Sequence, residues 1–341
     1  MENGYICTLS KNILTMYNIA LIAGGDSGEY EVSLRTGDNI YQMMDKSLFN
    51  PYLIHFKGSA WTWKDPEGNI HPIDKNDFSL MVDEKKITFD VAFIAIHGTP
   101  GENGKLQSYF EMLGIPYTGC GSFSSALTFN KYYCNLAVSA LGIPISPSLH
   151  FYRSDRIDYA AIEQVCGYPC FVKSCNSGSS VGVTKVHNVG ELDKAFEEAF
   201  KYDNQLMVEK FVHGREMTCG VTAVYGAVQL LAITEVVATN EFYDYDAKYS
   251  AVGHKLLTPA NISPQHQAVL KEYSERIFHH LDCKGVVRID FIISEDDGIP
   301  YFLEINTIPG QTALSIIPEQ VRYNQLDLTD FYTRLIKEAL Q

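Results

Sequence analysis

The first third of the chain alternates apolar runs with glycine-rich breaks. The run "IALIAGG" at 19–25 predicts a buried strand, and "VSLRTGDNIYQMM" after it has helical spacing of its apolar residues. A second run, "VAFIAIHG" at 91–98, predicts a strand parallel to the first, because uninterrupted apolar strands are typical of parallel sheets. We therefore expect an N-terminal α/β domain over 18–119, ending where Gly and Pro cluster in "GIPYTGCG".

After this domain the apolar runs become shorter and more numerous. The sequence "ELDKAFEEAFKY" predicts an amphipathic helix, and "LTDFYTRLIKEAL" predicts a helix that closes the chain. The predicted strands are "CFVK", "VGVTKV", "QLMVEKFV", "VTAVYG" (221–226), "VQLLAITEVVA", "GVVRIDFII" and "YFLEIN". This mixture indicates two α+β lobes, over 120–209 and 210–341, with residues 1–17 as a short N-terminal leader.

The last two predicted strands carry polar residues at matching positions. Side chains alternate along a strand, so Glu304 and Asn306 point to one face of "YFLEIN". By the same rule Arg288 and Asp290 share a face of "GVVRIDFII". The Asp-Gly pair between the strands predicts a hairpin centred near Asp297, which places Asp290 directly opposite Glu304. Two carboxylates and an amide oxygen would then converge, as suits Mg²⁺; a solvated sheet face is the alternative.

A Gly- and Ser-rich loop, "KSCNSGSSVG" at 173–182, joins two of the predicted strands. Its backbone N–H groups and the hydroxyls of Ser179 and Ser180 could cover a phosphate chain. The loop lacks the GK[ST] signature of a Walker A motif, and a strand rather than a helix follows it. Lys131 and Lys173 are candidate phosphate-binding cations. A plain hairpin loop and two surface lysines are the alternative interpretation.

Two further segments combine unusual residue types next to predicted strands. The segment "EFYDYDAKYS" at 241–250 holds several aromatic side chains among charges, which suits a loop that closes over a ligand. An Ω-loop packed on itself is the alternative. The segment "HGTPGENGKLQ" places His97 at the carboxyl end of a buried parallel strand, where α/β proteins bind ligands. A lone histidine at such a position is also a common structural residue.

Composition narrows the class of protein. The 341 residues are 46% hydrophobic and 20% charged, as in ordinary globular proteins. The net charge of −14 argues against nucleic acid as a partner, because phosphate backbones bind clustered Lys and Arg. The 8 cysteines lack a paired metal-binding spacing, which favours free thiols in a reducing compartment. No run suits a membrane helix, and the interrupted apolar N-terminus does not fit a signal peptide, so we expect a cytoplasmic protein.

Seven motifs, in this order, resemble those of the D-alanine-D-alanine ligases across nearly the whole chain. They are "GGDSGEYEVS", "HGTPGENG", "KSCNSGSSVGV", "EKFVHGRE", "EFYDYDAKY", "GVVRIDF" and "FLEINTIPGQT". The resemblance implies the ATP-grasp fold, in which two α+β lobes clamp ATP and an N-terminal α/β lobe completes the amino-acid site. It implies ATP-dependent joining of two D-alanine molecules through a D-alanyl phosphate, with release of ADP and phosphate, for peptidoglycan synthesis.

The resemblance also implies roles for single residues. The implied metal ligands, for two Mg²⁺ bridged by the glutamate, are Asp290, Glu304 and Asn306. The implied ATP-binding residues are Lys131, Lys173, Ser180, Glu209, Lys210, Val212 and Glu216. The implied catalytic residues are Glu29, His97, Ser179, Tyr249, Arg288 and Gly310. The groups that would hold the carboxylate of the second D-alanine are Lys248 and Ser315.

Several of these roles are specific. Glu29 matches the anchor for the amino group of the first D-alanine, and with Ser179 and Tyr249 it resembles a hydrogen-bonded triad that ties a lid loop shut. Arg288 and the Gly310 N–H match an oxyanion hole. The resemblance further implies a homodimer that binds neither nucleic acid nor membrane. It allows Mn²⁺ in place of Mg²⁺ and leaves activation by a monovalent cation open.

Some positions depart from the commonest pattern of that family, and other functions remain to be weighed. The departures are Tyr30, "CNSGSS", Asn103, Gln311 and Leu314, none of which has an implied chemical role. Ligation of D-alanine to D-lactate is one alternative, which the Tyr249 hydroxyl disfavours. Another ATP-grasp ligase, a catalytically inactive nucleotide-binding scaffold and a nicotinamide dehydrogenase are the others. The missing G-x-G-x-x-G pattern disfavours the dehydrogenase.

Overall fold

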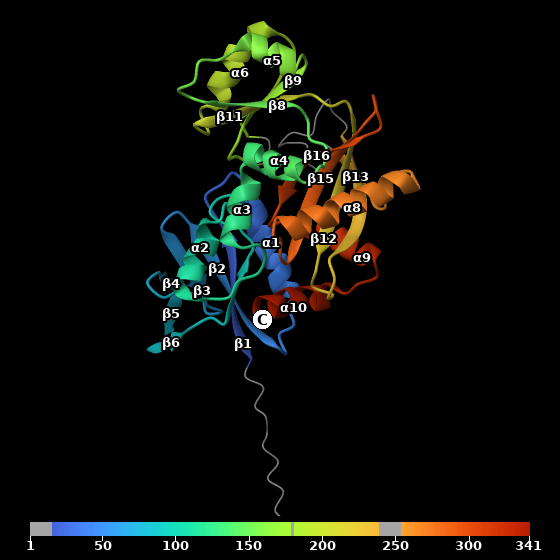
Figure 1. Cartoon of the computed structure of the whole chain (residues 1–341). Helices are drawn as coiled ribbons and strands as arrows, with labels where there is room; N and C mark the ends of the chain where they lie inside the picture. Colours follow the sequence, from blue (N-terminus) through green and yellow to red (C-terminus); the bar gives the residue numbers. More distant parts are fainter. Residues whose placement is uncertain (1–15, 179–180, 239–253) are drawn as a thin grey trace, which may run out of the picture.

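The computed structural model describes residues 16–178, 181–238 and 254–341, and within them the chain forms three sheets. Each sheet lies at the centre of one lobe (Figure 1). In that view the N-terminal lobe lies at the lower left, the central lobe at the top and the C-terminal lobe at the right. The predicted architecture, one α/β domain followed by two α+β lobes, is confirmed.

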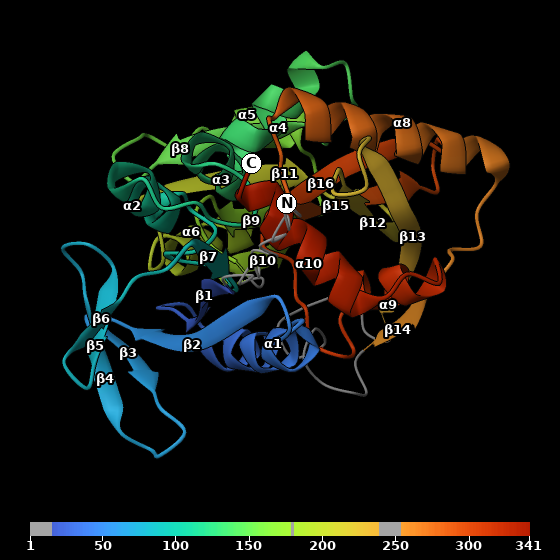
Figure 2. The same cartoon turned by 90° about the horizontal axis from the view of Figure 1, so that it is seen from below.

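The N-terminal lobe is built on a mixed sheet with the strand order β6-β5-β4-β3-β2-β1-β7 in the described residues. The first apolar run forms β1, which pairs in parallel with β2 and with β7, the second run. The strands β3 to β6 form an antiparallel meander that extends away from the rest of the lobe (Figure 2). The elements are β1 (Tyr17–Gly24), α1 (Tyr30–Met43), β2 (Phe49–Lys57), β3 (Ala60–Lys64), β4 (Ile70–Asp74), β5 (Ser79–Val82), β6 (Lys85–Ile87), β7 (Val91–Ile94) and α2 (Lys105–Leu113).

The central lobe is an antiparallel sheet with the order β10-β9-β11-β8. The helices α5 and α6 cover one face and complete a core that contains Phe151, Ile162, Val172 and Phe196 but no residue from another lobe among those described. The elements are β8 (Ser148–Tyr152), α5 (Tyr159–Val165), β9 (Cys170–Ser174), β10 (Val183–Val186), the 3-10 helix η1 (Val189–Glu191), α6 (Leu192–Ala199) and β11 (Gln205–Lys210).

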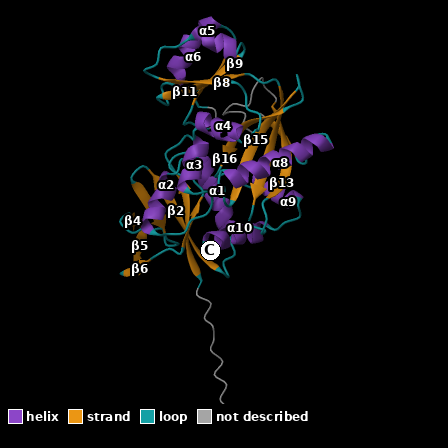
Figure 3. Ribbon diagram, viewed as in Figure 1, coloured by secondary structure: helices purple, strands orange, loops and turns teal. Residues whose placement is uncertain are grey.

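The C-terminal lobe is an antiparallel sheet with the order β14-β13-β12-β15-β16 in the described residues. The helix α8 packs on one face of this sheet and α9 on the other (Figure 3). The elements are β12 (Gly214–Thr222), β13 (Gln229–Ala238), β14 (His254–Leu257), α8 (Pro264–His280), β15 (Val286–Ser294), β16 (Pro300–Asn306), α9 (Ile316–Tyr323) and α10 (Leu328–Ala339).

One predicted strand of this lobe is wrong in its position. The run "VTAVYG" was expected as a strand, but β12 ends at Thr222 and the chain turns at Ala223–Gly226. The Gly226 N–H donates to the Ala223 carbonyl, and the Tyr225 ring stacks on Phe331. Val224 and Tyr225 are therefore partly buried against the core that contains α10, and not by membership of a strand.

Two helices connect the N-terminal lobe to the central lobe. These are α3 (Ser122–Phe129) and α4 (Lys131–Ala140), within the stretch expected as part of the central lobe. They contact β16, and Cys134 and Val138 of α4 belong to the core of the C-terminal sheet. A further core joins the N-terminal sheet to α9 and α10, so the N- and C-terminal lobes are packed together.

Two findings in the described residues concern the cysteines and the helices. The cysteines there, Cys120, Cys134, Cys166, Cys170, Cys175, Cys219 and Cys283, are all free and buried. None of the described helices has both the length and the apolar character needed to span a bilayer.

Candidate active site

A cavity of about 820 Å³ lies where the lobes meet. The N-terminal lobe contributes the start of α1 and the turn after β7, and the C-terminal lobe contributes β12, β15, β16 and the turn before α9. The predicted site residues that line it are Glu29, His97, Lys131, Glu216, Arg288, Asp290, Glu304, Asn306, Gly310 and Ser315. Residues predicted from distant parts of the sequence therefore share one cavity.

The hairpin of β15 and β16 forms one wall of this cavity. Asp290 pairs directly with Glu304, as predicted, and Arg288 pairs with Asn306. The register then shifts at a bulge after Asp290, which the sequence did not indicate. The alternate face of β15, with Val287 and Ile289, is buried in the lobe's core. The polar face is thus fixed toward the cavity because the apolar face is needed for packing.

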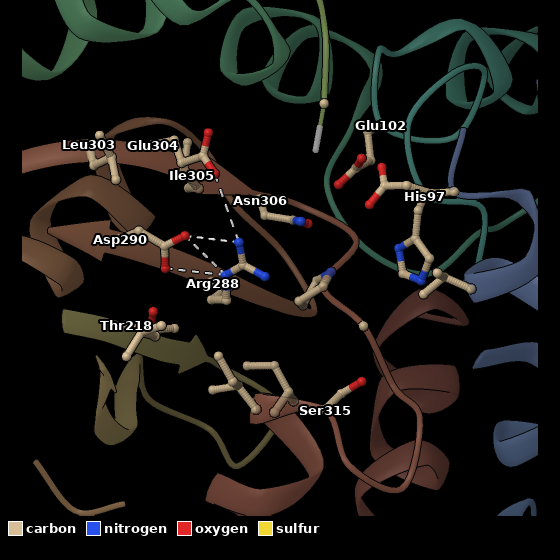
Figure 4. A pocket seen from close by; sticks show the side chains of 18 of the residues that line it. His97, Glu102, Thr218, Arg288, Asp290, Leu303, Glu304, Ile305, Asn306 and Ser315 are labelled. Carbon is tan, nitrogen blue, oxygen red and sulfur yellow. Dashed lines mark hydrogen bonds and ion pairs between the residues drawn. The ribbon is translucent and has the colours of Figure 1, made fainter. Parts of the chain in front are cut away.

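Cations of the protein itself contact the two carboxylates on this wall. The Arg288 guanidinium donates to Asp290 through Nε, at 3.2 and 3.1 Å from the two carboxylate oxygens, and through Nη2 at 2.9 Å. The same Nη2 lies 3.9 Å from Glu304 Oε1 (Figure 4). Lys131 Nζ lies 3.7 Å from Glu304 Oε2 and donates to the Ser177 carbonyl at 2.7 Å. The wall therefore holds interleaved positive and negative groups.

The donor atoms on this wall fit a hard cation. Asp290 and Glu304 supply carboxylate oxygens, and Asn306 supplies an amide oxygen that also accepts the Ile308 N–H at 3.0 Å. In the described residues no three His, Cys, Asp or Glu side chains form a metal-binding group. One or two carboxylates are nevertheless a usual protein contribution to a Mg²⁺ site, since the ion keeps positions for water and substrate phosphates.

A second polar cluster lies in the central lobe. Lys173 Nζ forms an ion pair with Glu209 Oε2 at 2.5 Å, and the Asn135 amide donates to Glu209 Oε1 at 3.3 Å. Glu209 is buried, at 3% exposure, so this pair is shielded from solvent. Lys173 and Glu209 were each predicted from the sequence as ATP-binding residues, but their ion pair was not.

The chain leaves the central lobe just after this cluster. Lys210 ends β11, and its carbonyl accepts the Ser146 hydroxyl at 2.6 Å. Val212 lies in the connection to β12, and Glu216 on β12 lines the cavity. The candidates Lys210, Val212 and Glu216 thus lie along the stretch of chain that leads from the central lobe into the C-terminal lobe.

His97 is a buried connector between two walls of the cavity. Its Nδ1 donates to the Ile308 carbonyl at 2.9 Å, and its Nε2 lies 3.0 Å from the Thr36 hydroxyl. Because a carbonyl only accepts, Nε2 is the acceptor for Thr36 in the neutral ring. Burial lowers the pKa of His97, which favours this neutral form. The strand β7 ends at Ile94, so His97 lies in the following turn and not at the strand end itself.

The turn after β16 brings two further candidates together. A Cβ atom built on Gly310 would lie 2.9 Å from Ser315 Oγ, so the glycine allows a close approach. Ser315 Oγ accepts the Thr312 N–H at 3.0 Å and lies 2.8 Å from the Thr312 hydroxyl. The turn is tied to α1, because Asn39 Nδ2 donates to the Gln311 carbonyl at 2.6 Å.

Glu102 is one of the cavity residues that sequence reasoning missed. It lies in the turn after β7, is 7% exposed, and accepts the Gly98 N–H at 2.5 Å through Oε2. Burial and the nearby Glu29 carboxylate raise its pKa to about 8. The available signal was a glutamate between glycines in "GENG", directly after a buried strand.

Four predicted site residues lie outside the described residues. They are Ser179, Ser180, Lys248 and Tyr249. The predicted triad of Glu29, Ser179 and Tyr249 and the segment "EFYDYDAKYS" therefore stay predictions.

The lobes and the cavity together define the class of protein. An α/β domain followed by two α+β lobes, with the candidate phosphate-binding Lys131 in the cavity between them, is the ATP-grasp architecture. Family models of the D-ala D-ala ligase N-terminus and C-terminus match residues 18–120 and 137–337. The chain belongs to the D-alanine–D-alanine ligase family.

Individual relatives agree with this assignment. A D-alanine–D-alanine ligase of Parabacteroides distasonis is 44% identical, over 95% of this chain and 98% of its own. The solved D-alanyl-alanine synthetase A of Vibrio cholerae superposes with a TM-score of 0.87 at 32% identity, covering 96% of this chain and 99% of its own. The VanG D-Ala:D-Ser ligase of Enterococcus faecalis superposes with a TM-score of 0.84 at 30% identity, covering 95% and 99%.

Proposed function

We propose that this protein joins two D-alanine molecules to D-alanyl-D-alanine, using ATP and releasing ADP and phosphate. The supporting observation is the shared cavity, in which Glu29, Arg288 and Glu304 come from separate lobes and strands to one place. The named activity of the 44% identical relative supports the choice of substrate. The product would serve peptidoglycan synthesis.

The proposed nucleotide site lies between the central and C-terminal lobes. Lys131 and Lys173 would neutralise phosphate oxygens, and the stretch Glu209–Val212 would recognise the adenine edge. Glu216 would accept hydrogen bonds from the ribose hydroxyls. Ser179 and Ser180 belong to the loop that would cover the phosphates. The ion pair of Lys173 with Glu209 supports this arrangement, because the two residues proposed to contact the nucleotide lie side by side.

Asp290, Glu304 and Asn306 would hold two Mg²⁺, or Mn²⁺ in their place. When bound, the metal neutralises negative charge on the transferring phosphoryl group. The side chains of Arg288 and Lys131 compensate the charge of the same carboxylates, so the wall tolerates the buried Asp290 beside the partly exposed Glu304. We leave activation by a monovalent cation as an open part of the proposal.

The chemistry follows from the weakness of a carboxylate as an electrophile. Phosphorylation of the first D-alanine gives an acyl phosphate with a good leaving group, and the amine of the second D-alanine then attacks. Glu29 would hold the first ammonium group, while Ser315 and Lys248 would hold the second carboxylate. Arg288 and the Gly310 N–H would donate to the tetrahedral oxyanion, where one preorganised donor is worth roughly 3–4 kcal/mol.

The remaining residues would position these groups and exclude water. Neutral His97 holds the turn that carries Gly310 by donating to the Ile308 carbonyl. Ser179 and Tyr249 would tie the lid to Glu29, which protects the acyl phosphate from hydrolysis. We further propose that the enzyme works in the cytoplasm as a homodimer.

Mass spectrometry of the products tests the proposed reaction. The protein would be incubated with Mg-ATP and equal amounts of D-alanine, D-lactate and D-serine near neutral pH. D-alanyl-D-alanine with ADP is the expected result. D-alanyl-D-lactate or D-alanyl-D-serine as the main product would overturn the acceptor, and no coupled product would overturn the reaction.

The variant Glu304→Ala tests the metal argument. Loss of this carboxylate should lower the rate of ADP release by ~1,000-fold, because charge stabilisation of the transferring group is lost. The fold should persist, since the Glu304 side chain is 31% exposed. Asp296→Ala, at the exposed tip of the same hairpin, is the control and should keep full activity. Full activity of a folded Glu304→Ala protein would remove the metal argument.

A further inference from the structure

Glu102 is a buried carboxyl group with one oxygen left for a ligand. Its Oε2 accepts the Gly98 N–H at 2.5 Å. In the ranges 16–178, 181–238 and 254–341, no hydrogen-bond donor reaches its Oε1. The side chain is more than nine-tenths buried and still lines the cavity, on the side opposite Asp290 (Figure 4). Oε1 therefore faces the space that substrate would occupy.

Glu29 approaches the same place from another element. It is the residue immediately before α1, and it also lines the cavity. A Cβ atom built on Gly98 would lie 3.7 Å from Glu29 Oε2, while the Gly98 N–H is the donor to Glu102. The two carboxyl groups thus both approach Gly98, Glu102 at its N–H and Glu29 at the position of a built Cβ atom.

The charges around Glu102 favour a positively charged ligand. Burial and Glu29 raise its pKa to about 8, with a smaller contribution in the same direction from Glu304. Arg288 and the Gly98 N–H act in the opposite direction. His97, the other titratable group of this turn, is buried and favoured in its neutral form. A cation placed beside Oε1 would offset both the burial and the repulsion from Glu29.

We propose that Glu102 and Glu29 together bind the ammonium group of the first D-alanine. An ammonium group has three N–H donors and one positive charge, so it can satisfy two carboxyl groups at once. Near neutral pH, Glu102 gives up its proton to the buffer as the ammonium group binds, and no other bond changes. The inference deepens the proposed function and rests on it.

A structural role for Glu102 alone predicts different behaviour. If the side chain only braced the turn through Gly98, its removal would change stability and would leave proton exchange on ligand binding unaltered. Binding calorimetry separates the two roles, because heats measured in buffers of different ionisation enthalpy report the number of protons released.

The experiment titrates D-alanine into the full-length protein with Mg²⁺ and a non-hydrolysable ATP analogue at pH 7. The wild-type protein should release nearly one proton as the first D-alanine binds. Glu102→Gln should bind D-alanine roughly 10- to 100-fold more weakly, as expected for a lost hydrogen bond to a charged group, and should release no proton. Glu102→Asp should keep the proton release.

Glu338→Gln is the matched control. The Glu338 carboxylate also accepts a glycine N–H, that of Gly285 at 2.8 Å, and burial also raises its pKa, but it lies on α10 and outside the cavity. This variant should bind D-alanine and release protons like the wild type.

Each other outcome has a definite meaning. Binding without proton release in the wild type, or unchanged affinity and proton count in Glu102→Gln, would overturn the inference and leave the proposed function standing. No binding of D-alanine to the wild type would overturn both. The number of protons released by the wild-type protein tests the inference by itself. The inference can therefore be rejected even if Glu102→Gln folds poorly.

Discussion

Asp290 and Glu102 are carboxyl groups on opposite sides of one cavity, and both are nearly buried, at 2% and 7% exposure. Asp290 accepts hydrogen bonds from the Arg288 guanidinium at both carboxylate oxygens. Glu102 accepts a backbone N–H and lies near the like charge of Glu29. The two acids are therefore similarly buried, but Asp290 lies beside a cation and Glu102 lies near another carboxyl group.

Burial alone therefore does not decide whether an acidic side chain is ionised. A guanidinium in contact stabilises a carboxylate, whereas a second carboxylate favours the protonated form. On the β15–β16 wall, Arg288 and Lys131 already lie beside the two carboxyl groups before phosphates and metal arrive. The carboxyl group of Glu102, in the turn after β7, should become charged only when a cation binds beside it. The two sides of the cavity therefore suit the two ends of a reaction between ATP and an amino acid.

Removal of the cation beside Asp290 should give the largest effect on stability. Arg288→Gln leaves a buried carboxylate without its partner, which should lower the free energy of unfolding by about 3 kcal/mol or more. Urea denaturation in the presence of a chelator would measure the loss. The control is Arg334→Gln, whose ion pair with Asp330 is exposed and screened by solvent, so its removal should change stability far less. Equal losses of unfolding free energy in the two variants would show that the Arg288–Asp290 pair stabilises the fold no more than the exposed Arg334–Asp330 pair.

The proton on Glu102 should give a pH-dependent effect, which is smaller for each pH unit than the loss caused by Arg288→Gln. Its pKa is about 8 in the folded protein, above the ordinary value of 4.5. Between these values the folded state holds a proton that the unfolded state lacks, so the free energy of unfolding falls as pH rises. The slope is at most about 1.4 kcal/mol per pH unit, because one proton is involved.

Urea denaturation of the ligand-free protein from pH 5 to pH 8 would measure this slope. Glu102→Gln cannot titrate, so its stability should decline less with pH than that of the wild type. The difference between the two profiles isolates Glu102 from the other titrating groups. Parallel profiles would mean that Glu102 is already ionised in the folded protein.

The smallest effect should come from the glycine that links the two acids. Gly98 has φ +69°, and a Cβ atom there would lie 2.7 Å from Ser27 Cβ. Gly58 has φ +54° with no atom within 4 Å of such a Cβ. Gly58→Ala should therefore cost about 1 kcal/mol from the backbone alone, and Gly98→Ala roughly 2 kcal/mol because of the added contact. Urea denaturation would compare the free energies of unfolding of the two variants. Equal losses would mean that Ser27 moves away from the new methyl group without a loss of stability.

The sequence predicted the parts of the site that depend on local regularity. The register of Asp290 with Glu304 followed from strand alternation and an Asp-Gly turn, both of which act over a few residues. The bulge after Asp290, where the register with β16 shifts, was not indicated by the alternation of residue types along the two strands. The parallel pairing of β1 with β7 followed from uninterrupted apolar runs.

Other features were missed for physical reasons. The strand β12 turns Glu216 and Thr218 toward the cavity, so its sequence lacks an apolar run. The meander β3–β6 is largely exposed, which removes the alternation that marks a half-buried strand. Glu102 gains its character from burial and from Glu29, which is far away in the sequence, so no local pattern could reveal it.

The separate core of the central lobe has a consequence for cooperativity. The N- and C-terminal lobes share a core, whereas α5, α6 and the sheet β8–β11 bury their apolar residues among themselves. A segment with its own core can open as an independent unit while the rest stays folded. A nucleotide that contacts both the central and the C-terminal lobe would couple these units. Ligand binding would then make two thermodynamic parts of the molecule behave as one.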